Sequence, residues 1–301
     1  MNEMCTVLTI DNENLLGRTM DFPPRTPWKM TYLPRNYMWE PATKTEIVKD
    51  KYAILGGMRE VDGHWLIGDG INETGLVCAE LFFPVAASYP RKTKEGNVVL
   101  TPQDFIHWIL ANYTSVEELI TDLPNISVIQ KRWYDGEQYP FHWVMMDKTG
   151  TYGIEPLNGK LAIFKNEVGA FTNTPSFSNH LSRLNYFLQL KDRNEFSGET
   201  KEALVNNCLE ITGRNSVERF ILAAKARWSD EVRTREQVND FLKKVTIPNV
   251  PAHAHNYTHY RTIIDRGKRE YTFIDLHTGT TEIYRIDDLL SKFSQPHRFN
   301  V

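Results

Sequence analysis

Alternating apolar and polar residues dominate the first hundred positions, whereas the middle of the chain carries the three- to four-residue spacing of helices. Strands are predicted at 5–10, 15–20, 29–34, 52–56, 63–68 and 75–83. Asp69-Gly70 and the stretch from Asn72 to Gly75 are expected to form the tight connection before the last of these strands. Later strands are predicted at 141–146, 159–164, 257–265, 270–276 and 281–285. Strands therefore open and close the chain.

Helices are expected between these strands. One is predicted from Thr101 to Asn112, with Pro102 in its first turn, and Ser115 and Glu118 have the spacing of a capping box that starts another. Three or four more are expected within 177–189, 200–210, 216–228 and 234–245. No internal repeat or flexible linker divides residues 1–301, so the pattern predicts a single α+β domain with two sheets covered by helices.

The N-terminal hairpin brings a cysteine close to a basic residue of the following strand. If Asn12 and Glu13 form its tip, Cys5 lies opposite Met20, and Arg18 lies diagonal to Cys5 at roughly 7–8 Å between backbones. Cys5, Arg18 and Met20 then share one face, because side chains alternate along a strand. A guanidinium at this position is expected to lower the pKa of the thiol and favour the thiolate.

Asp21 follows the second strand of this hairpin, where it can orient an amine on Cys5. Without residues 1–4, Cys5 would carry both a thiol and a free α-amino group with a pKa of about 7.7–8.0. That amine can take the thiol proton, so the cysteine can act as its own base. For these three residues taken alone, an ordinary hairpin with a buried cysteine and a surface ion pair is the alternative.

Composition narrows the class of protein. The chain has 301 residues, of which 41% are hydrophobic and 24% charged, and its formal net charge is −3. These values are typical of a globular protein and argue against nucleic acid or an anionic membrane as partner. No apolar run is long enough to span a bilayer, and the start lacks a secretory signal. The three cysteines have no CxxC spacing, so we expect reduced thiols and a cytoplasmic location.

Five motifs, in order along the chain, carry a resemblance to a known family. They are the strand that starts at Cys5 and the segments 17–22, 69–84, 171–185 and 215–220. Together they resemble the choloylglycine hydrolase family, which contains bile salt hydrolases and penicillin V acylases. These proteins are N-terminal nucleophile hydrolases. The resemblance implies a four-layer αββα sandwich, in which two stacked antiparallel sheets are flanked by helices.

The resemblance also implies a set of catalytic residues, which are Cys5, Arg18, Asp21, Phe82, Asn173 and Arg219. Cys5 is the implied nucleophile, and Arg18 and Asp21 position it and its amine. The side-chain N–H of Asn173 and the backbone N–H of Phe82 are the implied donors to the oxyanion of amide hydrolysis. Arg219 corresponds to a distal arginine that holds the charge network.

Apolar side chains near these motifs are expected to line an acyl pocket, namely Met20, Phe22, Met58, Trp133, Tyr134 and Phe141. In the family, bile salt hydrolases typically have an asparagine where this chain has Phe82, and penicillin acylases have a tyrosine. We therefore expect a penicillin V acylase-like amidase that cleaves the linear amide of an N-acyl small molecule. Conjugated bile salts and N-acyl homoserine lactones are the alternatives within the family. The expected mechanism needs no cofactor.

The chain departs from the family pattern in three places. Asn2 to Met4 separate Met1 from Cys5, so either Met4 is the true start or a short propeptide removes itself. Segment 190–215 lacks the Leu-Pro-Gly-Asp stretch that helps relatives form tetramers, which argues against a tetramer. The expected assembly is a homo-oligomer, either a dimer or a tetramer. Glu80 shares a strand face with Phe82, where it either lines the pocket or is ion-paired or at the surface.

Two other kinds of protein must be considered. His253, His255 and His259 have the H-x-H-x-x-x-H spacing of some metal hydrolases, although no second motif completes such a site. The chain could also be a non-catalytic relative that binds acyl amides. A binding protein has no need of an oxyanion asparagine, so the presence of Asn173 favours an enzyme.

Overall fold

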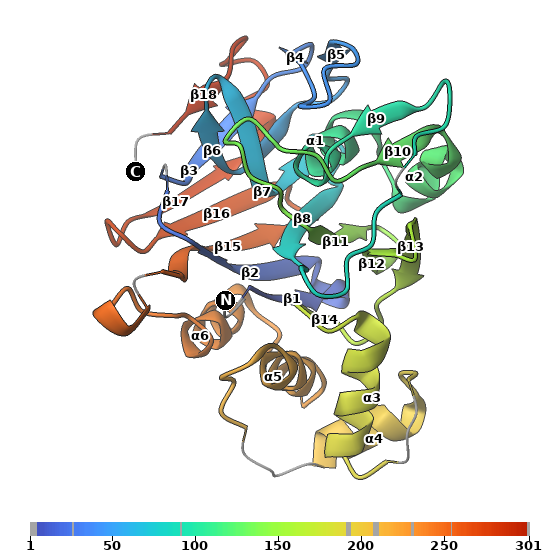
Figure 1. Cartoon of the computed structure of the whole chain (residues 1–301). Helices are drawn as coiled ribbons and strands as arrows, with labels where there is room; N and C mark the ends of the chain where they lie inside the picture. The colour runs from blue at the N-terminus through green and yellow to red at the C-terminus, as the bar shows by residue number, and fades with distance from the viewer. Residues whose placement is uncertain are drawn as a thin grey trace.

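The structure is a computed structural model that describes residues 5–25, 27–90, 92–190, 194–206, 211–229, 232–253 and 255–299. Two antiparallel sheets are stacked face to face, and helices cover the outer face of each (Figure 1). This order of helix, sheet, sheet and helix is the αββα architecture that the sequence predicts.

The first sheet has six strands in the order β14-β1-β2-β15-β16-β17. The strands are β1 (Thr6–Ile10), β2 (Leu15–Phe22), β14 (Ala170–Thr172), β15 (Tyr257–Asp265), β16 (Glu270–Asp275) and β17 (Thr281–Arg285). The N-terminal hairpin has the predicted register, with Val7 opposite Arg18 and Ile10 opposite Leu15. Its turn closes through Asn14, which adopts the left-handed conformation with φ of 58°. The hairpin therefore lies inside this sheet, with β14 and β15 on its two sides.

The second sheet has eight strands in the order β13-β12-β11-β8-β7-β6-β3-β18. They are β3 (Lys29–Leu33), β6 (Ile54–Val61), β7 (His64–Asn72), β8 (Val77–Phe82), β11 (Phe141–Asp147), β12 (Gly150–Leu157), β13 (Lys160–Lys165) and β18 (His297–Arg298). Two small pairs lie outside the main sheets, β4 (Met38–Trp39) with β5 (Val48–Lys49) and β9 (Val98–Leu100) with β10 (Ile126–Val128).

The helices are α1 (Pro102–Asn112), α2 (Val116–Asp122), α3 (Phe177–Phe187), α4 (Gly198–Asn206), α5 (Ser216–Trp228) and α6 (Arg235–Lys244). In Figure 1, α5 and α6 cover the first sheet, and α1 covers the second. α5 packs on β1 and β14, and α1 packs on β7 and β8. Residues 207–210, where the sequence extends the predicted helix 200–210, lie outside the described residues.

The predicted capping signals are present, but one is incomplete. Thr101 and Asp104 form a full capping box at the start of α1. Ser115 accepts a hydrogen bond from the backbone N–H of Glu118. The carboxylate of Glu118, however, accepts from Thr114 instead of completing a box with Ser115. The predicted boundary of α2 is right, and its reciprocal hydrogen bond is not formed.

Two strand predictions are wrong. Asp69 and Gly70 do not form a turn, because β7 continues through Asn72 and only residues 73–76 connect it to β8. Paired strands on both sides outweigh the turn preference of an Asp-Gly pair. The sequence prediction also missed β12, since its two glycines and a proline are poor strand formers. The continuation of β7 matters for the site, because it places Asp69 inside a buried strand.

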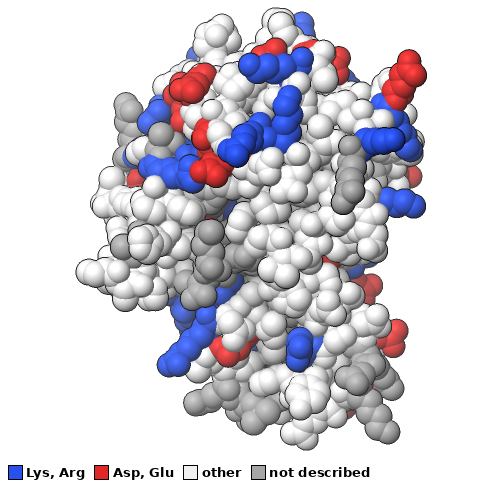
Figure 2. All heavy atoms as spheres, in the orientation of Figure 1, with Lys and Arg blue, Asp and Glu red and all other residues white. Residues whose placement is uncertain are grey.

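Figure 2 shows basic and acidic side chains interspersed in the upper part of the face in view. Within the described part of the chain, no helix is both long enough and apolar enough to cross a bilayer.

Candidate active site

The register of the first sheet places Cys5 between two strands that are distant in the sequence. Thr6 lies opposite Thr19 on β2 and opposite Thr172 on β14. One residue further along the same ladders, Cys5 is flanked by Met20 on one side and Asn173 on the other. The side chain of Cys5 is buried, with 3% of its surface exposed.

Arg18 reaches from the first sheet to the second, past the cysteine. Its Nη2 lies 3.9 Å from Cys5 Sγ, and its Nη1 lies 2.8 Å from Asp69 Oδ2. The same guanidinium donates to the backbone carbonyls of Gly68 and Glu80. Burial alone would lower the pKa of Arg18, but the charges of Asp69 and Cys5 raise it. Arg18 is therefore a fixed positive charge beside the sulfur.

The net shift of the thiol pKa is upward, although Arg18 itself lowers this pKa as predicted. Burial raises the pKa of the Cys5 thiol, and the charge of Arg18 offsets this only in part. The charge of Asp21 adds to the increase. Arg18 acts in the predicted direction, but desolvation of a fully buried thiol outweighs one cation. A thiolate at Cys5 therefore needs a base or a further positive charge close to the sulfur.

Asp21 lies beside Cys5 at the end of β2. Its backbone carbonyl accepts a hydrogen bond from Cys5 Sγ at 3.5 Å. Its carboxylate accepts from Thr19 Oγ1 at 3.0 Å and from Thr258 Oγ1 on β15. Burial raises the pKa of Asp21 to about 6, although the two hydroxyl donors and the charge of Arg219 oppose the increase. Asp21 therefore changes charge just below neutral pH.

Arg219 and Asn173 meet on the other side of the cysteine. Arg219 comes from the first turns of α5, and its Nε donates to Thr6 Oγ1 at 3.0 Å. Its Nη2 lies 3.4 Å from the carbonyl oxygen of Cys5 and 3.2 Å from Asn173 Oδ1. Since an amide oxygen can only accept, this contact orients the amide so that its NH₂ group points away from Arg219.

The NH₂ group of Asn173 is directed to the end of β8. Asn173 Nδ2 donates to the carbonyl oxygen of Phe82 at 2.9 Å. The N–H of Phe83 donates to Pro140 on the neighbouring strand, so the N–H and C=O of Phe82 face the opposite edge. The backbone N–H of Phe82 and the amide of Asn173 are therefore on the same edge, next to Cys5.

Two of the six predicted pocket residues, Phe22 and Phe141, belong to one row of aromatic rings. The ring of Phe82 is 6.4 Å from that of Phe141, which stacks on Tyr139 at 5.6 Å, and Tyr139 is 5.5 Å from Phe22. Met20 is next to this row, with its Sδ 3.7 Å from Arg18 Nη2. We therefore place Phe22, Phe141 and Met20 beside the site, together with Tyr139, which lies in the predicted loop but was not singled out.

The other three predicted pocket residues have different partners. Trp133 donates through Nε1 to Asp104 at the start of α1, at 2.9 Å. Tyr134 stacks on His64 and donates to the carbonyl of Glu40. Met58 is fully buried on β6. These contacts tie Trp133 and Tyr134 to α1 and the second sheet, and Trp133 and Met58 belong to the same buried core cluster as Cys5.

The sequence analysis missed residues that hold the site together. Asp69 pairs with Arg18, and Tyr260 and Tyr271 donate to its carboxylate. Thr258 holds Asp21. Asp69 belonged to a recognised motif, but nothing in the sequence linked it to tyrosines almost two hundred residues away. Glu80, whose role was left open, is buried at 2% exposure, and burial raises its pKa well above the usual range.

The three histidines of the metal alternative do not lie together in one site. His253 ends a short 3-10 helix and is exposed, as is His255. His259 is buried on β15, where its Nε2 lies 2.8 Å from the carbonyl of Phe22 and its Nδ1 lies 3.2 Å from His277 Nε2. Among the described residues, no group of three or more His, Cys, Asp or Glu is arranged to hold a metal ion.

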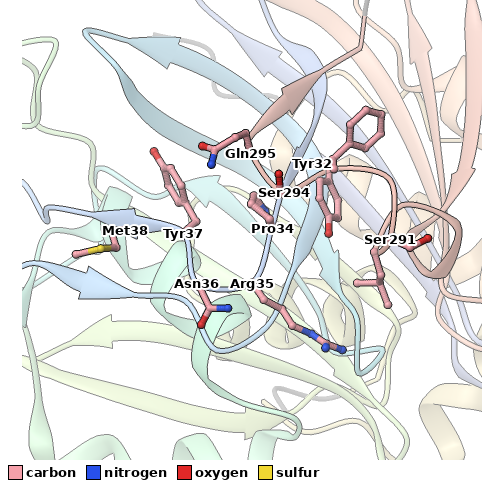
Figure 3. Close-up of a pocket in the computed structure, with 11 residues that line it drawn as sticks. Tyr32, Pro34, Arg35, Asn36, Tyr37, Met38, Ser291, Ser294 and Gln295 are labelled. Carbon is pink, nitrogen blue, oxygen red and sulfur yellow. The ribbon is translucent and has the colours of Figure 1, made fainter.

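A large surface pocket lies away from this site. It has a volume of about 660 Å³ and is formed by the loop after β3 and the segment before β18 (Figure 3). Figure 3 shows Arg35, Tyr37, Ser294 and Gln295 around it. None of the predicted site residues is part of its lining.

The raised pKa of Asp21 gives a prediction for the pH dependence of activity and stability. We expect kcat/KM to rise with pH through about 6, because only ionised Asp21 can orient a charged amine. We expect Asp21→Asn to abolish this rise of kcat/KM with pH. Asp147→Asn, which changes a buried aspartate away from the site, should retain it.

The same ionisation affects stability. The folded state holds the Asp21 proton more tightly than the unfolded chain, so raising the pH from about 4 to 6 lowers the free energy of unfolding. Initial rates and urea unfolding across pH 4–8 measure both effects, and an unchanged acid limb in Asp21→Asn would refute the assignment.

Comparison with known proteins agrees with this geometry. The family model described as linear amide C–N hydrolases, choloylglycine hydrolase family, matches residues 5–288. A bile salt hydrolase/transferase of Clostridium perfringens is 34% identical over 195 residues, which are 62% of this chain and 59% of that protein. One of Lactiplantibacillus plantarum is 32% identical over 201 residues, 64% of this chain and 61% of the relative. These alignments span about three fifths of the length of the curated relatives.

Solved structures show the same fold over the whole chain. A mutant of the conjugated bile acid hydrolase from Clostridium perfringens superposes with a TM-score of 0.80 and 25% identity, covering 99% of this chain and 97% of the other. Penicillin V acylase from Agrobacterium tumefaciens has a TM-score of 0.72 at 19% identity, with 98% and 90% coverage. The fold is therefore that of the N-terminal nucleophile hydrolases. The chain belongs to the choloylglycine hydrolase family of linear amide C–N hydrolases, which confirms the predicted resemblance.

Proposed function

We propose that this protein hydrolyses the linear amide bond of an N-acyl small molecule, with Cys5 as the nucleophile. The observation that carries the proposal is the convergence on one thiol of three groups from separate parts of the chain. Arg18 lies 3.9 Å from its sulfur, Arg219 lies 3.4 Å from its carbonyl oxygen, and Asn173 is bound to Arg219. A binding protein needs no such arrangement around a buried thiol.

The reaction begins with the loss of the thiol proton. Once the residues before Cys5 are removed, its α-amino group takes this proton. Asp21 fixes the position of the amine, and Arg219 holds the carbonyl oxygen of Cys5. The thiolate then attacks the amide carbonyl carbon, and the carbonyl oxygen becomes an oxyanion. The ammonium returns its proton to the leaving amine as the C–N bond breaks, which leaves a thioester on Cys5. Water, deprotonated by the same amine, releases the carboxylic acid.

Two N–H groups are in place for the oxyanion. The NH₂ of Asn173 carries two hydrogens, and its bond to the Phe82 carbonyl uses one of them. The second hydrogen and the backbone N–H of Phe82 are the donors that we assign to the oxyanion. Because both are fixed before the substrate arrives, they stabilise the developing charge without reorganising. The phenyl side chain at position 82 leaves the backbone donor unchanged.

The aromatic row supports an aryl acyl group as the preferred substrate. Phe82, Phe141, Tyr139 and Phe22 pack against one another with ring centroids 5.5 to 6.4 Å apart, which makes the surroundings of the end of β8 aromatic. A phenoxyacetyl amide such as penicillin V carries an aromatic ring that can pack against such side chains. Conjugated bile salts are the second candidate, because the relatives from Clostridium perfringens and Lactiplantibacillus plantarum are named as bile salt hydrolases.

A substrate panel tests this function. We expect purified protein to release acid from penicillin V with a higher kcat/KM than from glycine- or taurine-conjugated bile salts or N-acyl homoserine lactones, and Cys5→Ala to release none. A preference for bile salts would overturn the aryl acyl assignment and leave the amidase intact. If protein that begins at Cys5 turned over no substrate of the panel, the proposed amidase activity toward these acyl groups would be refuted.

The setting of the reaction is also part of the proposal. We place the enzyme in the cytoplasm, where a reducing environment keeps a thiol nucleophile active. We propose a homo-oligomer, a dimer or a tetramer, because apolar side chains such as Tyr186 and Val85 are exposed on the surface. The mechanism uses a small-molecule substrate and no cofactor.

A further inference from the structure

A buried aspartate and two tyrosines lie behind Arg18, between the two sheets. Asp69 on β7 is fully buried. Its Oδ2 accepts from Arg18 Nη1 at 2.8 Å and from the hydroxyl of Tyr260 at 2.6 Å. Its Oδ1 accepts from the hydroxyl of Tyr271. The tyrosines come from β15 and β16 of the first sheet, so this cluster joins the two sheets directly behind the cysteine.

Small residues make room for this cluster. A Cβ atom on Gly57 would lie 2.3 Å from the hydroxyl oxygen of Tyr260, and one on Gly68 would lie 2.9 Å from it. Gly68 would also place its Cβ 2.1 Å from Met20 Cε. Any side chain at these positions would push the phenol away from Asp69. The glycines of β6 and β7 therefore have a specific role, which is to let Tyr260 reach the carboxylate.

We propose that Tyr260 and Tyr271 are positioning residues for the reaction, which hold Asp69 so that Arg18 stays against the sulfur of Cys5. This inference rests on the proposed role of Cys5 as the nucleophile. Neither tyrosine touches the sulfur, and both act through Asp69 and Arg18. With fewer donors, the Asp69 carboxylate draws the guanidinium toward itself and away from Cys5, and the thiolate loses its nearest cation.

The charges around Cys5 explain why this position matters. Arg18 and Asp21 of β2 act directly on the thiol, and Arg219 of α5 contacts the Cys5 carbonyl. Asp69 and Glu80 of the second sheet act on Arg18. Burial raises the pKa of the thiol, and Arg18 is the cation that opposes it. Burial and the charge of Asp69 raise the pKa of both tyrosines well above the usual range, so both remain neutral donors at any pH at which the enzyme works.

The two tyrosines should differ in effect. Tyr260 donates to the same carboxylate oxygen as Arg18, whereas Tyr271 donates to the other one. Loss of the Tyr260 hydroxyl therefore leaves Asp69 Oδ2, the oxygen that accepts from Arg18, with one donor fewer. A matched control is Tyr113, whose hydroxyl donates to Asp122 at 2.6 Å and which has no contact with the site.

The pH dependence of alkylation at Cys5 tests the proposal without any substrate. Iodoacetamide labelling of the Cys5 peptide is followed by mass spectrometry across pH 6–10 in the full chain. We expect Tyr260→Phe to raise the midpoint, the pH at which the labelling rate of Cys5 is half-maximal, and to slow labelling at pH 7 by about tenfold. Tyr271→Phe should change both quantities in the same direction but by less. Tyr113→Phe should change neither. In protein that already carries Arg18→Gln, adding Tyr260→Phe should not change the pH dependence of Cys5 labelling any further.

Two results would overturn the proposal. One is a folded Tyr260→Phe variant whose midpoint equals that of Tyr113→Phe. The other is a shift that persists undiminished in the Arg18→Gln background, since the tyrosine would then not act through the arginine. If Tyr260→Phe does not fold, the comparison of Tyr271→Phe with Tyr113→Phe decides. Because no turnover is measured, failure here is distinct from failure of the proposed amidase activity.

Discussion

Cys5→Ala is expected to abolish amide hydrolysis, with a loss in kcat of at least about a thousandfold. The sulfur is the only atom in the proposed mechanism that bonds to the acyl group, and no other described residue beside it can replace it. The fold should be retained, because a buried alanine occupies less space than the thiol and Cys5 Sγ makes only weak hydrogen bonds. Release of acid from the best substrate of the panel measures the effect.

Cys78→Ala is the matched control for this variant. Cys78 is also a free, fully buried cysteine, and it lies on β8 in the neighbouring sheet. Burial raises the pKa of its thiol well above the usual range, and no free α-amino group can take its proton as proposed for Cys5. We expect Cys78→Ala to retain kcat. Equal activity in Cys5→Ala and the native protein would remove Cys5 from the mechanism.

Asn173→Ala is expected to lower kcat by about 10²- to 10³-fold, with little change in KM. The reason is that its amide N–H bonds to the substrate oxygen only as that oxygen becomes negative. The substitution also leaves Arg219 Nη2 and the Phe82 carbonyl without this partner, which should lower the free energy of unfolding by about 1–3 kcal/mol. Steady-state kinetics and urea unfolding separate the two effects.

Asn179→Ala provides the comparison for Asn173→Ala. Asn179 lies six residues later, on α3, and its amide donates to Ser176 at 2.9 Å. We expect it to keep native kcat. If both alanine variants had the same kcat, the proposed oxyanion role of Asn173 would be wrong.

The local part of the site could be predicted from the sequence because it depends on short-range rules. The alternation of side chains and a short turn set the hairpin register, so the juxtaposition of Cys5 and Arg18 was predicted and is observed. Asn173 and Arg219 are more than 160 residues from Cys5, and only the resemblance to a family connected them to it. Their actual contacts depend on the pairing of β1 with β14 and on the packing of α5.

Two features could not be predicted, for physical reasons. The thiol pKa depends on how completely Cys5 is desolvated, and burial of one residue is a property of the whole fold. The Asp69 cluster requires a strand that continues through Asp69-Gly70, where local preference favours a turn. The bond of Trp133 to Asp104 could not be predicted for a similar reason, since it depends on where α1 begins.

The most direct test of the account is the mass of the catalytically active polypeptide. The mechanism requires the amino group of Cys5 to be free, so it predicts that protein which turns over substrate has an intact mass corresponding to a chain that starts at Cys5. Full activity in a preparation that retains Met1 to Met4 would contradict it.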